Sequence, residues 1–178
     1  MIIGVMKEIL EGEFRVAATP ETVKKLTKLG HSVYIESNAG IAASITNEMF
    51  ADAGGLIKNN SDIFKSDLLL KVRAPNDAEI EKLRPDQFIV GLLEPFNNDL
   101  TSQLSTKKVT AFSLESLPRN TRAQSMDVLS SQANIAGYKA VILAADYFKK
   151  FFPMLMTAAG TVKAARVIVL GAGVAGLQ

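Results

Sequence analysis

Three glycines near the C-terminal end of the sequence have the spacing of a phosphate-binding turn. Gly171, Gly173 and Gly176 form the pattern G-x-G-x-x-G directly after the apolar run Val167–Leu170. In such a turn the first glycine permits a tight bend, the second lets backbone N–H groups approach a pyrophosphate, and the third lets the next helix pack closely on the strand. The position after an apolar strand favours dinucleotide binding. The alternative is an ordinary strand–turn–helix whose glycines serve packing only.

A second unusual segment, residues 119–134, is rich in small uncharged polar side chains, and its helical part carries one charged residue, Asp127. Intervals of three, three and four place most of the polar residues on one helix face, namely Gln124, Asp127, Ser130, Ser131 and Asn134. Short polar groups with one carboxylate, flanked by Arg119 and Arg122, suit a neutral ligand that both donates and accepts hydrogen bonds, such as a carboxamide. The alternative is a closely packed buried helix in which Asp127 and the serines bind loop backbone. Residue chemistry alone does not decide between the two.

The composition excludes several classes of function. The 178 residues include no Cys and one His, His31, which excludes a disulfide framework, a cysteine nucleophile and any mechanism that needs two histidines, and argues against a metal site. The net charge of +2 is too small to favour nucleic acid or an anionic membrane as a partner. With 48% hydrophobic and 21% charged residues, the chain is expected to be globular and to fold without disulfide or metal.

The sequence contains no apolar run long enough to cross a bilayer. Residues 140–145 and 167–177 are the most apolar stretches, and both are far shorter than the required length of about 20 residues. Charged residues between positions 7 and 15 interrupt the N-terminal apolar segment, unlike a signal peptide. We therefore expect a cytoplasmic protein.

The first 118 residues alternate between apolar strand-like runs and short helical patterns. Strands are predicted at residues 2–5, 33–35, 68–72, 88–93 and 109–112. Helices are predicted between them at residues 20–29, 47–53, 77–83 and 99–104, the first with Thr19 as N-cap and Pro20 at its first position. This alternation predicts βαβ units and a mostly parallel sheet.

The alternation ends near Pro118. A single long helix is predicted from Arg122 to Phe152, with Gly137 as its weakest point, and it is followed by a connection and an apolar strand at Arg166–Leu170. The predicted fold class is therefore α/β: a Rossmann-like parallel-sheet lobe, a long connecting helix and the truncated start of a second Rossmann dinucleotide-binding lobe. The corresponding domains are residues 1–137 and 138–178.

Four stretches of the sequence resemble the alpha subunit of the proton-translocating NAD(P) transhydrogenases. They are Arg15–Pro20, Leu70–Pro75, Pro118–Ala140 and Phe151–Gln178. The most specific pattern is R-x-x-R-A-Q-S-M-D-x-L-S-S-Q-x-N-x-A-G-Y, which begins at Arg119. The resemblance covers essentially the whole chain and implies a homodimer in which each protomer has two Rossmann-like lobes, with the nucleotide in the cleft.

The resemblance also implies cofactors, partners and site residues. The family's peripheral domain of this kind binds NAD(H), a second peripheral domain binds NADP(H), and hydride passes directly between the nicotinamides while a membrane-domain subunit moves a proton. In this sequence the nicotinamide-side residues are Arg119 and Gln124, which orient the carboxamide, and Asp127 and Ser130, which complete the network. The diphosphate-binding residues are Gly171, Gly173, Val174 and Gly176. No side chain need act as acid or base, because the protein holds two nicotinamide rings in register. The protein would then be peripheral to the inner membrane through its partner subunits.

Alanine dehydrogenase, which shares this fold and the Arg-Val-Ala-x-Thr-Pro opening, is the main competing interpretation. That enzyme needs a substrate-binding Arg, a Lys and a catalytic His in its first domain. Arg15 is present, but the position of the Lys holds Arg73 and residues 87–98 contain no His. Arginine does not readily lose a proton and cannot replace such a lysine. Amino-acid deamination is therefore disfavoured.

Four other features carry expectations of their own. His31 is expected to be structural or solvent-facing, because no second His or Cys accompanies it. Lys71 lies at a strand end, where a charged side chain usually reaches solvent. Residues 154–156 (Met-Leu-Met) are expected to form an inter-lobe or dimer contact. Arg15 is expected to pair locally with one of three acidic residues, Glu8, Glu11 or Glu13.

Only two residues follow the glycine turn. The complete dinucleotide fingerprint includes an acidic residue about 20 positions further on. The isolated chain is therefore expected to be inactive, and to need the remainder of the nucleotide domain in cis or from a separate chain. The alternative is a non-catalytic remnant or assembly module of the same subunit.

Overall fold

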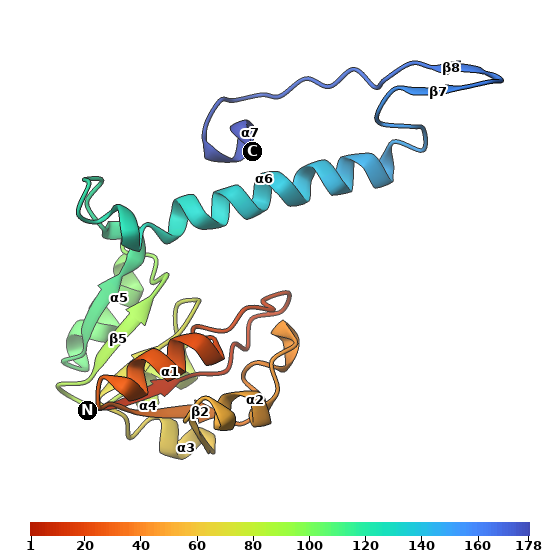
Figure 1. Cartoon of the computed structure of the whole chain (residues 1–178). Coiled ribbons are helices and arrows are strands. Elements are labelled where there is room, and N and C mark those ends of the chain that lie inside the picture. The colour runs from red at the N-terminus through yellow and green to blue at the C-terminus, as the bar shows by residue number, and fades with distance from the viewer. The chain divides into compact units, whose positions relative to one another are not determined.

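The computed structural model describes all of residues 1–178 (Figure 1). They form two compact units, Met1–Arg119 (unit 1) and Asn120–Gln178 (unit 2). No helix in the chain is both long enough and apolar enough to span a membrane. These units are defined by contacts in space. The predicted division of the sequence into domains 1–137 and 138–178 stays a prediction.

Unit 1 alternates strands with short helices. Its strands are β1 (Ile2–Val5), β2 (Ser32–Glu36), β3 (Leu56–Lys58), β4 (Leu68–Leu70), β5 (Phe88–Gly91) and β6 (Thr110–Ser113). Its helices are α1 (Pro20–Lys28), α2 (Asn47–Asp52), α3 (Asn60–Ile63), α4 (Asp77–Lys82) and α5 (Asn98–Thr106), with 3₁₀ turns at Ile41–Ala43 and Leu114–Ser116. Helix α1 begins where the sequence predicts, because the Thr19 side chain accepts a 3.3 Å hydrogen bond from the backbone N–H of Thr22 and Pro20 occupies the first helical position.

The six strands form one parallel sheet in the order β3-β2-β1-β4-β5-β6. Ile3 on β1 pairs with Val33 on β2 and with Leu68 on β4. The chain thus runs outward from β1 to one edge and then crosses over to β4 and the other edge, which is the order of a doubly wound Rossmann sheet. The predicted Rossmann-like α/β fold is confirmed, and the order reverses between β1 and β4.

The core of unit 1 consists of two clusters of buried hydrophobic side chains. One cluster joins the sheet to α3, α4 and α5 and contains Met6, Ile63, Phe64, Leu69, Ile80, Leu83, Ile89, Leu93, Leu100 and Leu104. The other joins the sheet to α1 and α2 and contains Val5, Ala18, Val23, Val33, Ile35, Ala39 and Phe50. Burial on both sides agrees with the general behaviour of parallel sheets, whose strands read as short apolar runs.

Unit 2 contains a 3₁₀ turn (Gln124–Met126), the long helix α6 (Val128–Tyr147), the antiparallel hairpin of β7 (Leu155–Thr157) and β8 (Gly160–Val162), and the short helix α7 (Val174–Leu177). The predicted helix from Arg122 to Phe152 is therefore wrong at both ends. It begins later because the Asp127 side chain caps it, accepting a 3.0 Å bond from the backbone N–H of Ser130. It ends earlier, with Phe148 as its C-cap and Lys149 in the left-handed conformation (φ 57°).

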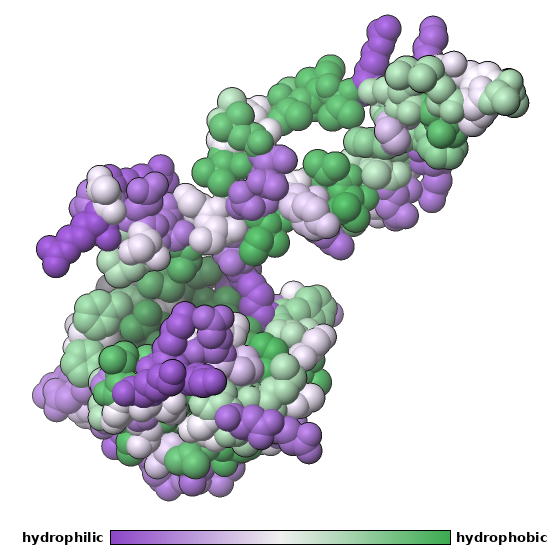
Figure 2. Space-filling view, viewed as in Figure 1, coloured by the Kyte–Doolittle hydropathy of each residue, from purple (hydrophilic) through white to green (hydrophobic).

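The strand predicted at Arg166–Leu170 is absent. A strand is stabilised by hydrogen bonds to a neighbouring strand, and no segment of residues 1–178 pairs with this one. Its apolar side chains are exposed, Ile168 at 85% and Leu170 at 95%. Figure 2 shows hydrophobic residues at the surface of the segment between β8 and α7. The pattern correctly marks a segment that needs burial, but the chain described here does not bury it.

Candidate functional site

The glycine turn has the local geometry that its spacing predicts. Gly171 has φ +115°, a conformation that favours glycine, and Gly173 is the N-cap of α7. A Cβ added to Gly176 would lie 2.1 Å from the carbonyl oxygen of Gly171, so the third glycine allows the helix to pack against the turn. A Cβ added to Gly173 would meet nothing within 4 Å, which leaves its backbone open to a ligand. The three glycines therefore differ in conformation and surroundings. Their binding of a diphosphate stays a prediction.

The remaining turn residue predicted for the diphosphate, Val174, is the first residue of α7 and is 43% exposed. It follows the open Gly173 directly. Its backbone N–H therefore belongs to the same turn as the three glycines. Its binding role stays a prediction.

The Asp127 carboxylate is organised by the first turn of α6. One oxygen accepts the backbone N–H of Ser130 at 3.0 Å and the other accepts the Ser130 hydroxyl at 2.6 Å. The hydroxyl of Ser131 donates to the Asp127 carbonyl oxygen at 3.1 Å. Asp127 and Ser130 are thus hydrogen-bonded to each other, and these bonds cap the helix. Their role toward a carboxamide stays a prediction. The buried-helix alternative does not describe α6 in this chain, since Gly137 is its only buried residue.

Gln124 and Arg119 are both exposed. Gln124 lies in the 3₁₀ turn that precedes Asp127, and the turn is held by Asn120, whose carbonyl oxygen accepts the Gln124 N–H at 3.1 Å and whose side chain accepts the Ala123 N–H at 2.9 Å. Arg119 is the last residue of unit 1. The roles of these two side chains toward a carboxamide stay predictions.

Helix α6 also contacts the glycine turn. One close approach is at Gly137, where an added Cβ would lie 2.2 Å from the carbonyl oxygen of Ala175 in α7. The side-chain amide of Asn134 donates to Oε1 of Gln178 at 2.7 Å. Unit 2 therefore brings α6, which contains Ser130 and is capped by Asp127, together with the predicted diphosphate turn. The sequence predicted Gly137 only as the weakest point of the helix and did not predict this contact. A lone glycine within a good helical pattern was the one sequence feature that pointed to it.

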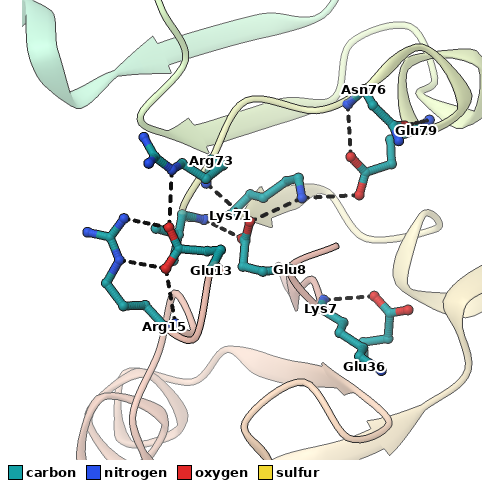
Figure 3. A network of polar contacts seen from close by, with 10 residues as sticks. Lys7, Glu8, Glu13, Arg15, Glu36, Lys71, Arg73, Asn76 and Glu79 are labelled. Carbon is teal, nitrogen blue, oxygen red and sulfur yellow. Dashed lines mark hydrogen bonds and ion pairs between the residues drawn. The ribbon is translucent and has the colours of Figure 1, made fainter. Parts of the chain in front are cut away.

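A second candidate position lies in unit 1, where the strand order reverses. In doubly wound sheets ligands bind beyond the carboxyl ends of the strands at this point. Here the loops after β1 and β4 supply a network of charged side chains from Glu8, Glu13, Arg15, Lys71 and Arg73 (Figure 3). The sequence predicted only the local pairing of Arg15 within this network and not the parts played by Lys71 and Arg73. The charged residues of 7–15 and the K-V-R run after β4 are the sequence signal of the network.

Lys71 does not reach solvent, and that prediction is wrong. Its side chain is 1% exposed, and Nζ lies 3.3 Å from Oε2 of Glu8 and 3.2 Å from Oε1 of Glu79. Glu8 also accepts the backbone N–H of Val72 at 2.6 Å and of Arg73 at 3.3 Å. The loop after β1 and helix α4 cover the strand end, and a buried ammonium is tolerated there because two carboxylates compensate its charge.

Arg15 pairs locally with Glu13, as predicted. Its Nε donates to Oε1 at 2.7 Å and its Nη2 to Oε2 at 2.6 Å, while Nε of Arg73 donates to the same carboxylate at 3.1 Å. The hydrogen bonds from Arg15 lower the pKa of Glu13 to about 2, against the opposing effect of burial, and Glu13 in turn raises the pKa of Arg15. Two arginines thus converge on one carboxylate of the protein itself at this position.

Profiles of two domains of one family match almost the entire chain. The N-terminal domain of the alanine dehydrogenase/PNT family matches residues 4–136, and the C-terminal domain matches residues 140–178. The chain belongs to the alanine dehydrogenase/PNT family. The family resemblance found in the sequence is confirmed.

Curated relatives in this family include both transhydrogenase subunits and alanine dehydrogenases. The NAD(P) transhydrogenase subunit alpha of Haemophilus influenzae is 46% identical over 178 residues, which are 99% of this chain and 35% of that protein. The first part of the NAD(P) transhydrogenase subunit alpha of Rhodospirillum rubrum is 45% identical over 186 residues, with 100% of this chain and 48% of that protein covered. Alanine dehydrogenase 1 of Staphylococcus aureus is 35% identical over 148 residues, covering 83% and 39%. The chain spans only a third to a half of the length of these relatives.

Solved structures agree with this family membership. The transhydrogenase from Sinorhizobium meliloti superposes with a TM-score of 0.96 at 45% identity and covers 99% of this chain and 54% of that one. An L-alanine dehydrogenase superposes with a TM-score of 0.85 at 30% identity, covering 99% and 50%. The relatives named in these comparisons are NAD(P) transhydrogenases and alanine dehydrogenases, which are nicotinamide-dependent oxidoreductases.

Proposed function

We propose that this chain forms the N-terminal portion of an NAD(H)-binding region of a proton-translocating transhydrogenase. The observation that supports this most directly is the contact of α6 with the glycine turn at Gly137 and Ala175. It joins, within one unit, the Asp127–Ser130 pair of the nicotinamide-side pattern and the turn suited to a diphosphate. The relatives with the higher identities, at 45–46%, are transhydrogenase alpha subunits.

The donor set around the turn fits a dinucleotide. The open space at Gly173 permits a diphosphate to approach the backbone closely. The Gln124 amide supplies both a donor and an acceptor, which a nicotinamide carboxamide requires. Asp127 and Ser130 are already fixed by their mutual hydrogen bonds, so little order is lost on binding. From the resemblance, Arg119 is the further residue that orients the carboxamide.

The reaction we infer is hydride transfer between NAD(H) on this subunit and NADP(H) on a partner domain. The cofactors supply the chemistry, and the residues named here bind and orient one ring. Correct placement of two reactants can supply a large share of a rate enhancement without an acid or base. We further infer a homodimer, a peripheral position at the membrane through partner subunits, and inactivity of residues 1–178 alone. The strongly exposed Met154 and Met156 of the β7–β8 region are candidates for the dimer contact.

The test is nucleotide binding by a chimera in which residues 1–178 are joined to the remaining residues of the Rhodospirillum rubrum relative. NADH and NADPH are titrated separately and binding is followed by nicotinamide fluorescence. Saturable binding that favours NADH, together with hydride transfer when the partner NADP(H) domain is added, is the expected result. A folded chimera that binds neither nucleotide contradicts the proposal and leaves the non-catalytic assembly module as the function.

Alanine dehydrogenation is the competing activity within the family, and the network at the β1–β4 switch point bears on it. The side chain of Arg15, the residue available to anchor a substrate carboxylate, donates two hydrogen bonds to Glu13, and the side chain of Arg73 donates one more. An incoming carboxylate would have to displace Glu13. Alanine-dependent reduction of NAD by the chimera would favour alanine dehydrogenation over the proposed transhydrogenase function.

A further inference from the structure

Gly137 is the point at which α6 touches the glycine turn by backbone alone. It is the only buried residue of this 20-residue helix. A Cβ at this position would lie 2.2 Å from the carbonyl oxygen of Ala175 and 3.0 Å from its carbonyl carbon and Cα. These are backbone atoms, which cannot rotate away as a flexible side chain can. Any larger residue must therefore move α7 or the turn relative to α6.

A second contact lies one helical turn away on the same face. Asn134 precedes Gly137 by three residues, and its side-chain amide donates to Oε1 of Gln178 at 2.7 Å. Ser130 precedes Asn134 by four residues and shares that face, since seven residues are close to two full turns. One face of α6 thus carries Ser130, Asn134 and Gly137 in order toward the turn.

The Asp127–Ser130 pair and the contact with α7 are separated along one face of α6. With a rise of about 1.5 Å per residue, the seven residues from Ser130 to Gly137 correspond to about 10 Å along the helix axis. The Asp127–Ser130 pair lies at one end of this span and the contact with α7 at the other. A nicotinamide and a diphosphate belong to one ligand, so an error in this spacing cannot be corrected by moving either end independently.

We propose that Gly137 is a positioning residue that sets the distance between the Asp127–Ser130 pair and the glycine turn, and thereby the fit of the whole dinucleotide. This inference rests on the proposed function. Gly137 itself touches no part of the cofactor. It acts through Ala175, by allowing the closest possible approach of the two backbones.

The test compares two ligands in the chimera described above and in its Gly137→Ala variant. NADH spans both ends of the site, whereas ADP-ribose has the diphosphate but no nicotinamide ring. Gly137→Ala is expected to weaken NADH binding by about tenfold or more and ADP-ribose binding by much less. Alanine has the higher helix propensity, so α6 itself should not be weakened. The matched control is Ala136→Ser, which adds one atom at the adjacent exposed position and is expected to change neither constant.

The outcomes separate this inference from the proposed function. Equal weakening of both ligands, or no change in either, overturns the positioning role of Gly137 while leaving NADH binding by the parent chimera intact. Failure of the parent chimera to bind either ligand contradicts the proposed function itself. If Gly137→Ala does not fold, the same two ligands are titrated against Asn134→Ala. This variant weakens the contact between α6 and the turn by removing the bond to Gln178, without adding an atom. A preferential loss of NADH binding supports the inference, and an unchanged ratio of the two constants overturns it.

Discussion

The Nζ atom of Lys71 lies 3.3 Å from Oε2 of Glu8, and neither side chain is more than 2% exposed. The same ammonium lies 3.2 Å from Oε1 of Glu79 in α4. The contact therefore joins the loop after β1, the end of β4 and the first turn of α4 at the point where the strand order reverses. A cluster of this kind specifies how these segments meet, because every charge in it depends on its partners.

Lys71→Met should strongly destabilise unit 1. The substitution keeps most of the volume but leaves Glu8 and Glu79 buried without a counter-charge, which typically costs about 3–5 kcal/mol. Urea unfolding followed by circular dichroism measures the loss. Lys65→Met is the matched control, since Lys65 pairs with Asp62 at the surface and such pairs contribute little. In the double variant Lys71→Met/Glu8→Gln the loss should be smaller than the sum of the single losses. Additive losses would show that the cluster is not coupled.

Glu13 should make the stability of unit 1 sensitive to acid. Its pKa is about 2 in the folded protein, chiefly because of the hydrogen bonds from Arg15, against 4.5 for the free side chain. A lowered folded-state pKa stabilises the protein above pH 4.5, and that stabilisation is lost progressively as the pH falls from 4.5 toward 2. The side chain is only 6% exposed, so the full contribution is on the order of 3 kcal/mol.

The measurement is urea unfolding of the parent and of Glu13→Gln between neutral pH and pH 2. The variant should be less stable at neutral pH, and the difference from the parent should shrink through the acidic range. Glu11→Gln, at an exposed position in the same loop, controls for the loss of one carboxylate. A difference between Glu13→Gln and the parent that does not depend on pH would contradict the assigned pKa.

The sequence predicts the Rossmann-like sheet well because its signals are local. Apolar runs such as Ile2–Val5, and the Thr19 cap before Pro20, determine where elements begin without reference to distant residues. The burial of Lys71 was not predictable in this way, since it depends on Glu8 and Glu79, which are 63 and 8 residues away in the chain. Strand β3, at Leu56–Lys58, was missed for a similar reason: three residues carry too little periodicity, and pairing with β2 defines it.

In the candidate site, too, features that depend on nearby residues were predicted, and features that depend on distant residues were not. Spacing alone predicted the glycine turn and the proximity of Asp127 to Ser130, because both lie within a few residues. Gly137 and Ala175 are 38 positions apart, so their contact could not be predicted from local spacing. The only sequence feature associated with it is a glycine inside a helical pattern. The start of α6 was predicted too early because helix propensity continues through Gln124, whereas the Asp127 side chain decides where the helix begins.

Asp127 offers a way to separate ligand binding from helix capping. Asp127→Ala removes both functions and should cost about 1 kcal/mol in stability as well as nucleotide binding. Asp127→Asn keeps an oxygen that can accept the Ser130 N–H, so it should retain stability but weaken NADH binding by the chimera. Thermal unfolding and fluorescence titration measure the two effects independently. Gln124→Ala, in the turn before the helix, should likewise impair hydride transfer more than folding. Unchanged turnover in both the Asp127 and Gln124 variants would remove these residues from the site.

Substitutions at Gly176 and Gly173 should have different effects, because an added Cβ would clash at Gly176 and has open space at Gly173. Gly176→Ala would place a Cβ 2.1 Å from the carbonyl oxygen of Gly171, so it should distort the turn and lower stability whether or not a ligand is present. Gly173→Ala meets no atom within 4 Å and has an ordinary backbone conformation, with φ −79°, so the unliganded turn should be unchanged.

Any loss of NADH binding in Gly173→Ala would therefore arise from a clash with the bound ligand and not from a change in the free turn. The added methyl group would occupy the space that a diphosphate needs for close approach to the backbone, and NADH affinity should fall by about tenfold or more while the melting temperature of the free chimera stays that of the parent. Ala158→Ser, at an exposed position between β7 and β8, serves as a control for adding one atom outside the turn. Parent-like NADH affinity in Gly173→Ala would mean that the diphosphate does not approach this backbone, and the spacing of the three glycines would then reflect only how α7 packs against the turn.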